Sequence, residues 1–199
     1  MTDRLVVDWD GTCTEVDGLH MILEQFGDRE IYERMEGELG DGLTLHEVIA
    51  AEFATVTLPL DEAVEWVRAN VTLRDGFHEL ARCHRPVIVS GGFRELIEPV
   101  LAREGVELEL LANSLETGAN GWRPLWRDET VCATCGEPCK RGILAGDPYV
   151  YVGDGYSDRC AARAAARVFA RDGLARWCEE SQVAYEPFHD LRDVLVALG

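Results

Sequence analysis

Short apolar runs and stretches with helical periodicity alternate along the chain from residue 76 onward. Apolar runs of this length between polar turns predict buried strands, and the stretches between them predict helices. The strands are predicted at 86–90, 107–112, 149–152, 167–170 and 183–185, a hairpin at 115–126, and helices at 93–104 and 158–166. Because strands that alternate with helices usually pair in parallel through crossover connections, this order predicts an α/β fold built on a parallel sheet.

The run Leu5–Asp8 is predicted to be the first strand of that sheet, and the segment that follows it is helical throughout. From residue 17 to residue 72, apolar residues recur at the spacing of amphipathic helices. These positions are Leu19, Ile22, Leu23 and Phe26, then Leu45, Val48, Ile49 and Phe53, then Leu60, Val64 and Val67. The pattern predicts about four helices without a strand, which is an all-helical insert after the first strand.

The charge of the chain argues against some classes of partner. Lys and Arg total 19 against 37 Asp and Glu, which gives a net charge of -18, and the sequence pI is 4.6. Neither nucleic acid nor an anionic membrane is therefore expected as a partner. The same charge repels a phosphorylated substrate, so a phosphate site would need a local source of positive charge such as a cation, a lysine or helix N-termini.

The sequence also carries an expectation about location. Its first residues lack a basic leader followed by an apolar stretch, and no apolar run approaches the roughly 18 to 20 residues that span a bilayer. The chain has seven cysteines and no export signal, so we expect reduced thiols and a cytoplasmic protein.

Three of the predicted strands end in polar, reactive residues: Asp8 and Asp10, then Ser90, then Asp154. Ligands of open α/β sheets bind beyond the carboxyl ends of the strands, so these side chains are expected to meet in one crevice. Asp8 and Asp10 are two positions apart and face the same side, where one can attack phosphorus and the other can transfer protons. With Asp154 they would form the oxygen-rich kind of site that suits Mg²⁺.

Two further features point to phosphate. Ser90 stands before Gly91, Gly92 and a predicted helix, so its hydroxyl and the amides of the helix start can hold phosphate oxygens. Lys140 opens another predicted helix and can stabilise charge on a transferring phosphoryl group. Taken singly, each motif has a plainer explanation, because aspartates cap turns, glycines occur in turns for conformational reasons and most lysines are solvated.

Together the motifs resemble those of a known family. The chain resembles the haloacid dehalogenase superfamily of phosphohydrolases, because it has that superfamily's four motifs in order. They are Asp8-Trp9-Asp10-Gly11-Thr12, then Ser90-Gly91-Gly92, then Lys140, then Gly153-Asp154-Gly155-Tyr156-Ser157-Asp158. The resemblance implies a Rossmann-like doubly wound parallel sheet as catalytic core, at residues 1–14 and 73–199, and a small all-helical cap domain at residues 15–72.

The resemblance also implies a role for each motif residue. Asp8 is expected to be the nucleophile that forms an aspartyl-phosphate, Asp10 the general acid and base, and Lys140 the third catalytic residue. The predicted phosphate-binding residues are Ser90, Gly91 and Thr12. The predicted Mg²⁺ ligands are Asp8, Asp154 and the backbone carbonyl of Asp10, with Asp158 orienting them or ligating through water.

The substrate is expected to be a small phosphorylated metabolite. Residues 87–93 resemble the phosphoserine phosphatase group, whereas residues 153–162 and the cysteine-rich approach to Lys140 resemble the phosphatases of methionine salvage, which act on an enol phosphate. Asp17 and residues 33–38 of the cap could face the leaving group. Two alternatives stay open: a phosphotransferase that uses the same intermediate, and a non-catalytic binding or regulatory module. A cap that opens and closes also predicts hinges at 14–17 and 72–75.

A cysteine cluster precedes Lys140. Cys132, Cys135 and Cys139 have a spacing that suits zinc, yet a closed structural site needs four ligands. Spacing does not place a fourth among Cys13, Cys83, His84 and Cys160. The alternatives are reduced cysteines that pack a loop, or a labile disulfide.

Overall fold

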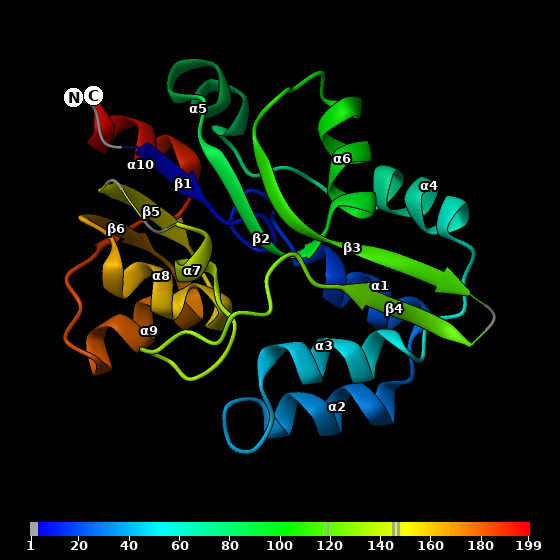
Figure 1. Cartoon of the computed structure of the whole chain (residues 1–199). Helices are drawn as coiled ribbons and strands as arrows, with labels where there is room; N and C mark the ends of the chain where they lie inside the picture. Colours follow the sequence, from blue (N-terminus) through cyan, green and yellow to red (C-terminus); the bar gives the residue numbers. More distant parts are fainter. Residues whose placement is uncertain (1–3, 119, 145, 147) are drawn as a thin grey trace.

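The computed structural model describes residues 4–118, 120–144, 146 and 148–199, and it contains one mixed sheet with helices on both faces (Figure 1). The strands are β1 (Arg4–Val7), β2 (Val87–Phe93), β3 (Leu110–Gly118), β4 (Gly121–Leu125), β5 (Tyr149–Gly153), β6 (Arg167–Ala170) and β7 (Glu186–Pro187). Their order across the sheet is β4-β3-β2-β1-β5-β6-β7, and every neighbouring pair is parallel except β3 with β4.

The helices follow the same chain order. They are α1 (Gly18–Phe26), α2 (Arg29–Glu38), α3 (Leu45–Phe53), α4 (Leu60–Asn70), α5 (Phe77–His84), α6 (Arg94–Arg103), α7 (Lys140–Ile143), the 3₁₀ turn η1 (Tyr156–Asp158), α8 (Arg159–Ala164), α9 (Asp172–Glu180) and α10 (Leu191–Leu198). Among the described residues, no helix is long and apolar enough to cross a membrane.

Side chains that alternate along the buried strands build two separate cores. Val7 of β1 packs in one cluster with residues of α5, α6 and α10, whereas its neighbour Val6 packs in a second cluster with residues of α8 and α9. Tyr151 and Val152 of β5 divide in the same way. Because successive strand residues point to opposite faces, a central strand with helices on both sides is apolar along its whole length. The predicted doubly wound α/β fold is therefore confirmed.

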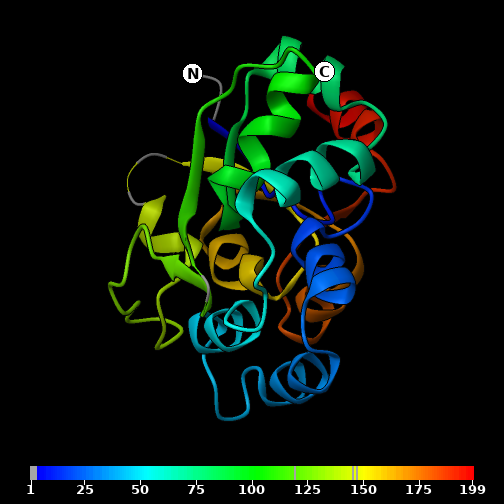
Figure 2. The same ribbon diagram turned by 90° about the vertical axis from the view of Figure 1, so that its right-hand side faces the viewer.

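Helices α1 to α4 form the helical insert, residues 18–70, between β1 and α5. Figures 1 and 2 show α2 and α3 at one end of the molecule, while α4 lies beside α6. The side chains of Asp17, Asp28 and Thr44 accept hydrogen bonds from the first turns of α1, α2 and α3, which fixes where these helices begin. The division into a core and a cap domain stays a prediction.

The two connections of the insert run side by side. The Glu15 amide donates to the Thr72 carbonyl at 2.9 Å, and Thr14 and Leu73 form an antiparallel bridge. The Arg74 guanidinium donates to the carbonyls of Gly11, Thr12 and Thr14 at 2.8 to 2.9 Å. This buried arginine therefore fastens the loop after β1 to the far end of the insert.

The sequence misplaced several boundaries. The predicted strand 107–112 and the first arm of the hairpin are one strand, β3, which pairs with β2 up to Asn113 and with β4 from Ser114. The predicted strand 183–185 is wrong, because the Val183 amide donates to the Cys178 carbonyl and ends α9, so pairing starts at Glu186. β2 also continues through the two glycines to Phe93, so α6 begins at Arg94.

Candidate active site

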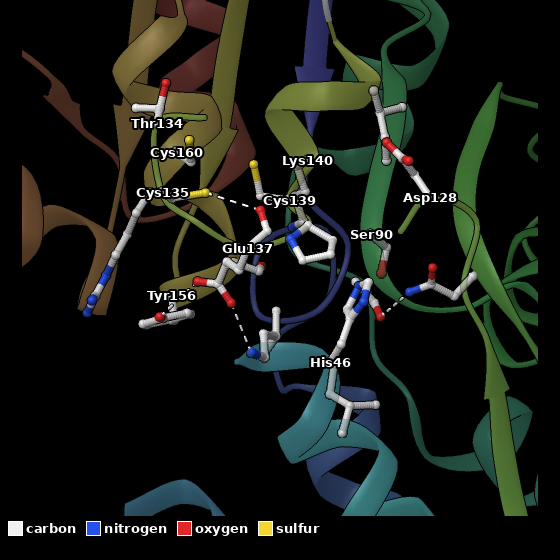
Figure 3. A pocket seen from close by; sticks show the side chains of 18 of the residues that line it. His46, Ser90, Asp128, Thr134, Cys135, Glu137, Cys139, Lys140, Tyr156 and Cys160 are labelled. Atoms are coloured by element: carbon white, nitrogen blue, oxygen red, sulfur yellow. Dashed lines mark hydrogen bonds between the residues drawn. The ribbon is translucent and has the colours of Figure 1, made fainter. Parts of the chain in front are cut away.

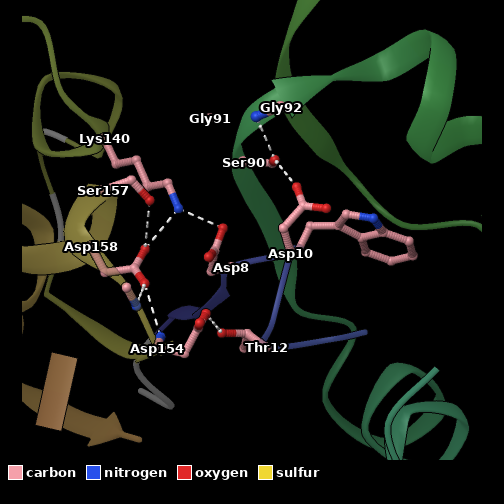
Figure 4. Close-up of polar contacts among 12 residues, drawn as sticks. Asp8, Asp10, Thr12, Ser90, Gly91, Gly92, Lys140, Asp154, Ser157 and Asp158 are labelled. Atoms are coloured by element: carbon pink, nitrogen blue, oxygen red, sulfur yellow. Dashed lines mark hydrogen bonds and ion pairs between the residues drawn. The ribbon is translucent and has the colours of Figure 1, made fainter. Parts of the chain in front are cut away.

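The polar strand ends converge at one edge of the sheet, as expected from parallel pairing. Figure 4 shows Asp8 and Asp10 after β1, Ser90 within β2, Asp154 after β5 and Lys140 at the start of α7 around a common centre. Asp8, Ser90 and Lys140 are each 5% exposed. The structure thus gathers residues from four separate segments that the sequence had selected by motif alone.

Lys140 contacts two carboxylates at this centre. Its Nζ lies 2.5 Å from Asp8 Oδ1 and 2.7 Å from Asp158 Oδ1. Burial lowers the pKa of Lys140, but the charges of Asp158 and Asp8 raise it by more, so the net shift is upward and the amine stays charged. The lysine is therefore a fixed cation beside the Asp8 carboxylate.

Asp158 is held on both of its oxygens. Oδ1 accepts hydrogen bonds from Lys140 and from the Tyr151 hydroxyl at 2.7 Å, and Oδ2 accepts from the amides of Asp154 and Gly155 at 2.9 Å. Its side chain is fully buried. A buried carboxylate with this many donors is anchored, so it orients both the lysine and the turn that carries Asp154.

Asp10 faces a different set of donors. Its Oδ1 accepts from the Gly18 amide at the start of α1 at 2.9 Å, and its Oδ2 accepts from the Ser90 hydroxyl at 3.4 Å. The Ser90 oxygen in turn accepts from the Gly92 amide at 2.8 Å. A Cβ at Gly92 would lie 3.0 Å from Asp10 Oδ2, so a larger residue there would push this carboxylate aside by a few tenths of an ångström.

Thr12 contacts Asp154. The fully buried Thr12 hydroxyl donates to Asp154 Oδ1 at 2.7 Å. Gly11 has a φ of +73°, and a Cβ there would lie 2.4 Å from Asp154 Oδ2. The turn after β1 is therefore shaped to hold Asp154, and phosphate binding by Thr12 stays a prediction.

The carboxylates raise one another's pKa values. Burial raises the pKa of Asp8 well above its usual range, and the charge of Asp158 adds to this while Lys140 opposes it. Burial and the charge of Asp17 raise the pKa of Asp10 to about 8, and burial with the charge of Asp158 raises that of Asp154 to about 7. One lysine thus leaves the cluster with an excess of negative charge, which a bound cation would offset.

Three carboxylates of the centre fit a divalent cation. One oxygen each of Asp8, Asp154 and Asp158 lies within 4.8 Å of the other two. Mg²⁺ prefers such hard oxygen donors and retains several waters, so a few carboxylates suffice. The Asp10 side chain is turned toward Gly18 and Ser90 and is not part of this group.

A cavity of about 230 Å³ lies between this centre and the insert. Its polar lining from the insert consists of Asp17, His20, Tyr32, Glu36 and Glu52, and its apolar lining of Leu19, Leu23, Leu39, Leu45, Ile49 and Phe53. Glu52 is 3% exposed, and its Oε1 has no hydrogen-bond partner among the described residues. Burial, together with the charges of Glu36 and Asp17, raises the pKa of Glu52 to about 8.

Comparison with known proteins now identifies the family. The model of the haloacid dehalogenase-like hydrolases matches residues 5–163. The chain belongs to this family. The hydrolase is 28% identical over 212 residues to the 2-hydroxy-3-keto-5-methylthiopentenyl-1-phosphate phosphatases of Bacillus mycoides (strain KBAB4) and Bacillus cereus (strain ATCC 14579), in alignments that cover 100% of this chain and 96% of each relative.

Solved structures show the same fold. A phospho-aspartyl intermediate analogue of phosphoserine phosphatase gives a TM-score of 0.73 at 17% identity, and a substrate-bound phosphoserine phosphatase complex gives 0.75 at 18% identity. Each match covers 100% of this chain and 99% of the solved one. Family, relatives and fold together support a phosphoric monoester hydrolase, as the motifs predicted.

Several residues of the hydrolase's site escaped sequence reasoning. Tyr151 was assigned only to a strand, Arg74 and Asn113 to no role, and Glu52 only to a helix. The Asn113 amide donates to the Gly91 carbonyl at 2.8 Å and so supports the end of β2 that carries Ser90. Arg74 and Asn113 act on residues far away in the sequence. Tyr151 acts on Asp158, seven residues further along, and as a polar tip in an otherwise apolar strand it carried a local signal.

Proposed function

We propose that this hydrolase is a Mg²⁺-dependent phosphomonoesterase that works through an aspartyl-phosphate on Asp8. The observation that carries the proposal is that Asp8 contacts Lys140 and lies close to the Asp154 carboxylate, and that Asp8 and Asp10 both line the cavity. A buried carboxylate next to a fixed cation can approach a phosphate dianion, which an exposed aspartate of this acidic chain would repel.

The residues account for both halves of the reaction. An Asp8 carboxylate oxygen attacks phosphorus, the bond from phosphorus to the leaving oxygen breaks, and Asp10 gives its proton to that oxygen. The raised pKa of Asp10, about 8, keeps this proton available at neutral pH. Asp10 then takes a proton from water, whose oxygen attacks phosphorus and releases Asp8 and inorganic phosphate.

The surrounding groups stabilise the phosphoryl oxygens. Lys140 supplies a fixed charge, and the Ser90 hydroxyl and the Gly91 amide supply donors, while the Gly92 amide holds Ser90 Oγ in place. Mg²⁺, held by Asp8, Asp154 and the Asp10 backbone carbonyl with Asp158 behind them, would supply the positive charge that this carboxylate cluster needs.

We infer that the leaving group carries no negative charge and is partly apolar. No Arg or Lys occurs among the described residues that line the cavity. Both ring nitrogens of His20 are already in contact, Nδ1 with the Tyr32 hydroxyl at 2.6 Å and Nε2 with Glu24 at 3.0 Å. A carboxylate such as that of phosphoserine would therefore face Asp17, Glu36 and Glu52 without a cationic partner.

A hydroxy-keto chain with a thioether tail suits this lining better. With a pKa of about 8, Glu52 is mostly protonated at pH 7, so it can donate to a keto oxygen or accept from a hydroxyl. The apolar side chains Leu23, Ile49 and Phe53 are suited to a thioether tail. The proposed substrate is therefore an enol phosphate of the kind named for the Bacillus relatives. As expected from the sequence, the proposed location is the cytoplasm.

The test is phosphate release from the methylthiopentenyl enol phosphate, phosphoserine and phosphocholine, each with Mg²⁺ and with chelator. We expect Mg²⁺-dependent turnover, with kcat/KM for the enol phosphate at least about tenfold above that for phosphoserine. A preference for phosphoserine would overturn the substrate assignment. In ¹⁸O-labelled water the released phosphate should carry the label, whereas delivery of phosphate to an acceptor alcohol would show a phosphotransferase.

A further inference from the structure

Four cysteines from two distant segments meet beside the active site. Cys132, Cys135 and Cys139 lie on the loop before α7, and Cys160 is the second residue of α8. All four sulfurs lie within 4.8 Å of one another, and all four thiols are free. Figure 3 shows Cys135, Cys139 and Cys160 grouped near Lys140. The loop spacing offered only three ligands, and the fold supplies the fourth.

The separation of the sulfurs fits a metal rather than a disulfide. In a tetrahedral zinc site the Zn–S bonds are about 2.3 Å, which places neighbouring sulfurs about 3.8 Å apart. The Sγ atoms of Cys132 and Cys160 are 3.8 Å apart. A disulfide would need about 2.05 Å.

The loop is folded around its first two cysteines. The Cys132 amide donates to the Glu137 carbonyl at 3.0 Å, and the Gly136 amide donates to the Cys132 carbonyl at 2.8 Å. The Thr134 amide points at Cys132 Sγ at 3.4 Å. Gly136 has a φ of +81°, which lets the chain reverse directly after Cys135. The turn thus brings the sulfurs of Cys132 and Cys135 close together, although this loop contains no helix or strand among its described residues.

We propose that Cys132, Cys135, Cys139 and Cys160 bind a structural Zn²⁺ ion. Four thiolates form a closed, soft ligand set that selects zinc over the hard cations of the carboxylate centre. The ion is separate from the Mg²⁺ of the proposed reaction and leaves no open position for substrate.

The site has a positioning role because its ligands flank active-site residues. Cys139 directly precedes Lys140, and Cys160 follows Asp158 by two residues. Lys140 and Asp158 form the 2.7 Å ion pair at the centre. A zinc ion bound by Cys139 and Cys160 would fix the position of Lys140 relative to Asp158. The loop between β4 and α7 has no regular structure among its described residues that could do this.

The same loop contacts the insert. Glu137, between two of the ligands, accepts a hydrogen bond from the Leu45 amide at the start of α3 and another from the Tyr156 hydroxyl, each at 3.0 Å. Zinc would therefore also fix the point at which the core loop meets α3.

The experiment uses the full chain purified under reducing conditions. We expect stoichiometric zinc by elemental analysis, and chelator-stripped protein should bind Co²⁺ with the visible and near-ultraviolet bands of tetrahedral thiolate ligation. Cys160→Ser should weaken zinc binding by more than the 10- to 100-fold that loss of an outer-shell partner typically costs. The matched control is Cys83→Ser, which changes an exposed cysteine of α5 and should leave zinc binding unchanged.

A catalytic readout separates positioning from mere folding. Where Cys160→Ser retains the native circular dichroism spectrum, we expect kcat to fall at saturating Mg²⁺ and excess Zn²⁺ to restore it in part. Asp8→Asn should abolish activity and keep its zinc, so the zinc site is tested even where the proposed reaction fails. The proposal would be overturned if the purified protein contained no zinc and gave no thiolate–cobalt band on addition of Co²⁺. A disulfide between Cys132 and Cys160 under native reducing conditions would also overturn it.

Discussion

Lys140 and Asp158 form a buried ion pair, with Nζ 2.7 Å from Oδ1. Both residues lie in short elements, Lys140 at the start of α7 and Asp158 in the turn η1. The pair connects the approach to α7 with the turn after β5, and the same amine reaches Asp8. The contact with Asp158 thus helps to position the Lys140 amine beside Asp8, the proposed nucleophile.

Replacing Lys140 by Met should therefore affect both stability and turnover. The change leaves two buried carboxylates without their shared partner, and breaking a buried pair in this way typically costs about 3 to 5 kcal/mol. We expect the free energy of unfolding in urea to fall by that order and phosphate release to be lost. Lys140→Arg keeps the positive charge but changes the size and shape of the charged group. Full activity in that variant would contradict a role that needs the compact amine.

Asp8→Asn should abolish turnover and leave the fold intact, because the amide keeps the shape of the side chain but lacks a nucleophilic oxygen. We expect kcat to fall by a factor on the order of 10³ or more. The control is Asp61→Asn, which changes an exposed aspartate at the start of α4 and should retain activity. Substantial phosphate release by Asp8→Asn would rule out the aspartyl-phosphate route.

Gly92→Ala should misplace Asp10. The new Cβ would lie 3.0 Å from Asp10 Oδ2 and 3.1 Å from Ser90 Oγ, so the carboxylate must shift. A misplacement of about 1 Å can cost about 10²-fold in rate, and the contact here requires a smaller shift, so we expect a measurable loss of kcat below that size. The same substitution at Gly37 in α2, where a Cβ meets nothing within 4 Å, should be silent. Equal activity in both variants would show that the close contact at Gly92 is unimportant.

Glu52 should make the protein less stable as pH rises. Its pKa is near 4.5 in the unfolded chain and about 8 in the fold, so the folded state binds more protons between these values. Its contribution is fully present below pH 4.5 and is lost as pH rises through 8. We expect Glu52→Gln to reduce the fall in unfolding free energy between pH 5.5 and 8.5.

Glu62→Gln, on the exposed side of α4, serves as the matched control for Glu52. Its stability curve should follow that of the native sequence. If Glu52→Gln shows the same pH dependence as the native sequence, Glu52 titrates at an ordinary value and the argument for a protonated carboxyl in the cavity fails.

The connections at 14–17 and 72–75 are predicted hinges. Val16 is 54% exposed, so a protease can reach this segment. We expect a phosphate analogue with Mg²⁺ to slow cleavage at both connections, because closure over the analogue would shield them. Glu137→Ala removes the acceptor for the Leu45 amide and should speed cleavage. Identical cleavage with and without the analogue would refute gating by the insert.

The sequence alone was sufficient to predict the enzyme class and the fold class. Aspartates, a serine and a lysine at the ends of predicted elements were sufficient to predict a phosphohydrolase with an α/β core, because strand ends in a parallel sheet must converge. The apolar runs at β1 and β5 likewise predicted buried strands, and the structure places both at the centre of the sheet. These signals are local, since each depends on a few adjacent residues and the elements they start or end.

Only the tertiary structure decided how the parts are held together. It placed Cys160 with the loop cysteines, Arg74 on the turn after β1, and Tyr151 and Lys140 on Asp158. It also showed that Glu52, which the sequence placed only within a helix, lines the cavity. The physical reason is that helical and strand periodicity report only on local structure. These contacts depend on how separate elements pack together, which the spacing of residues in the chain does not predict.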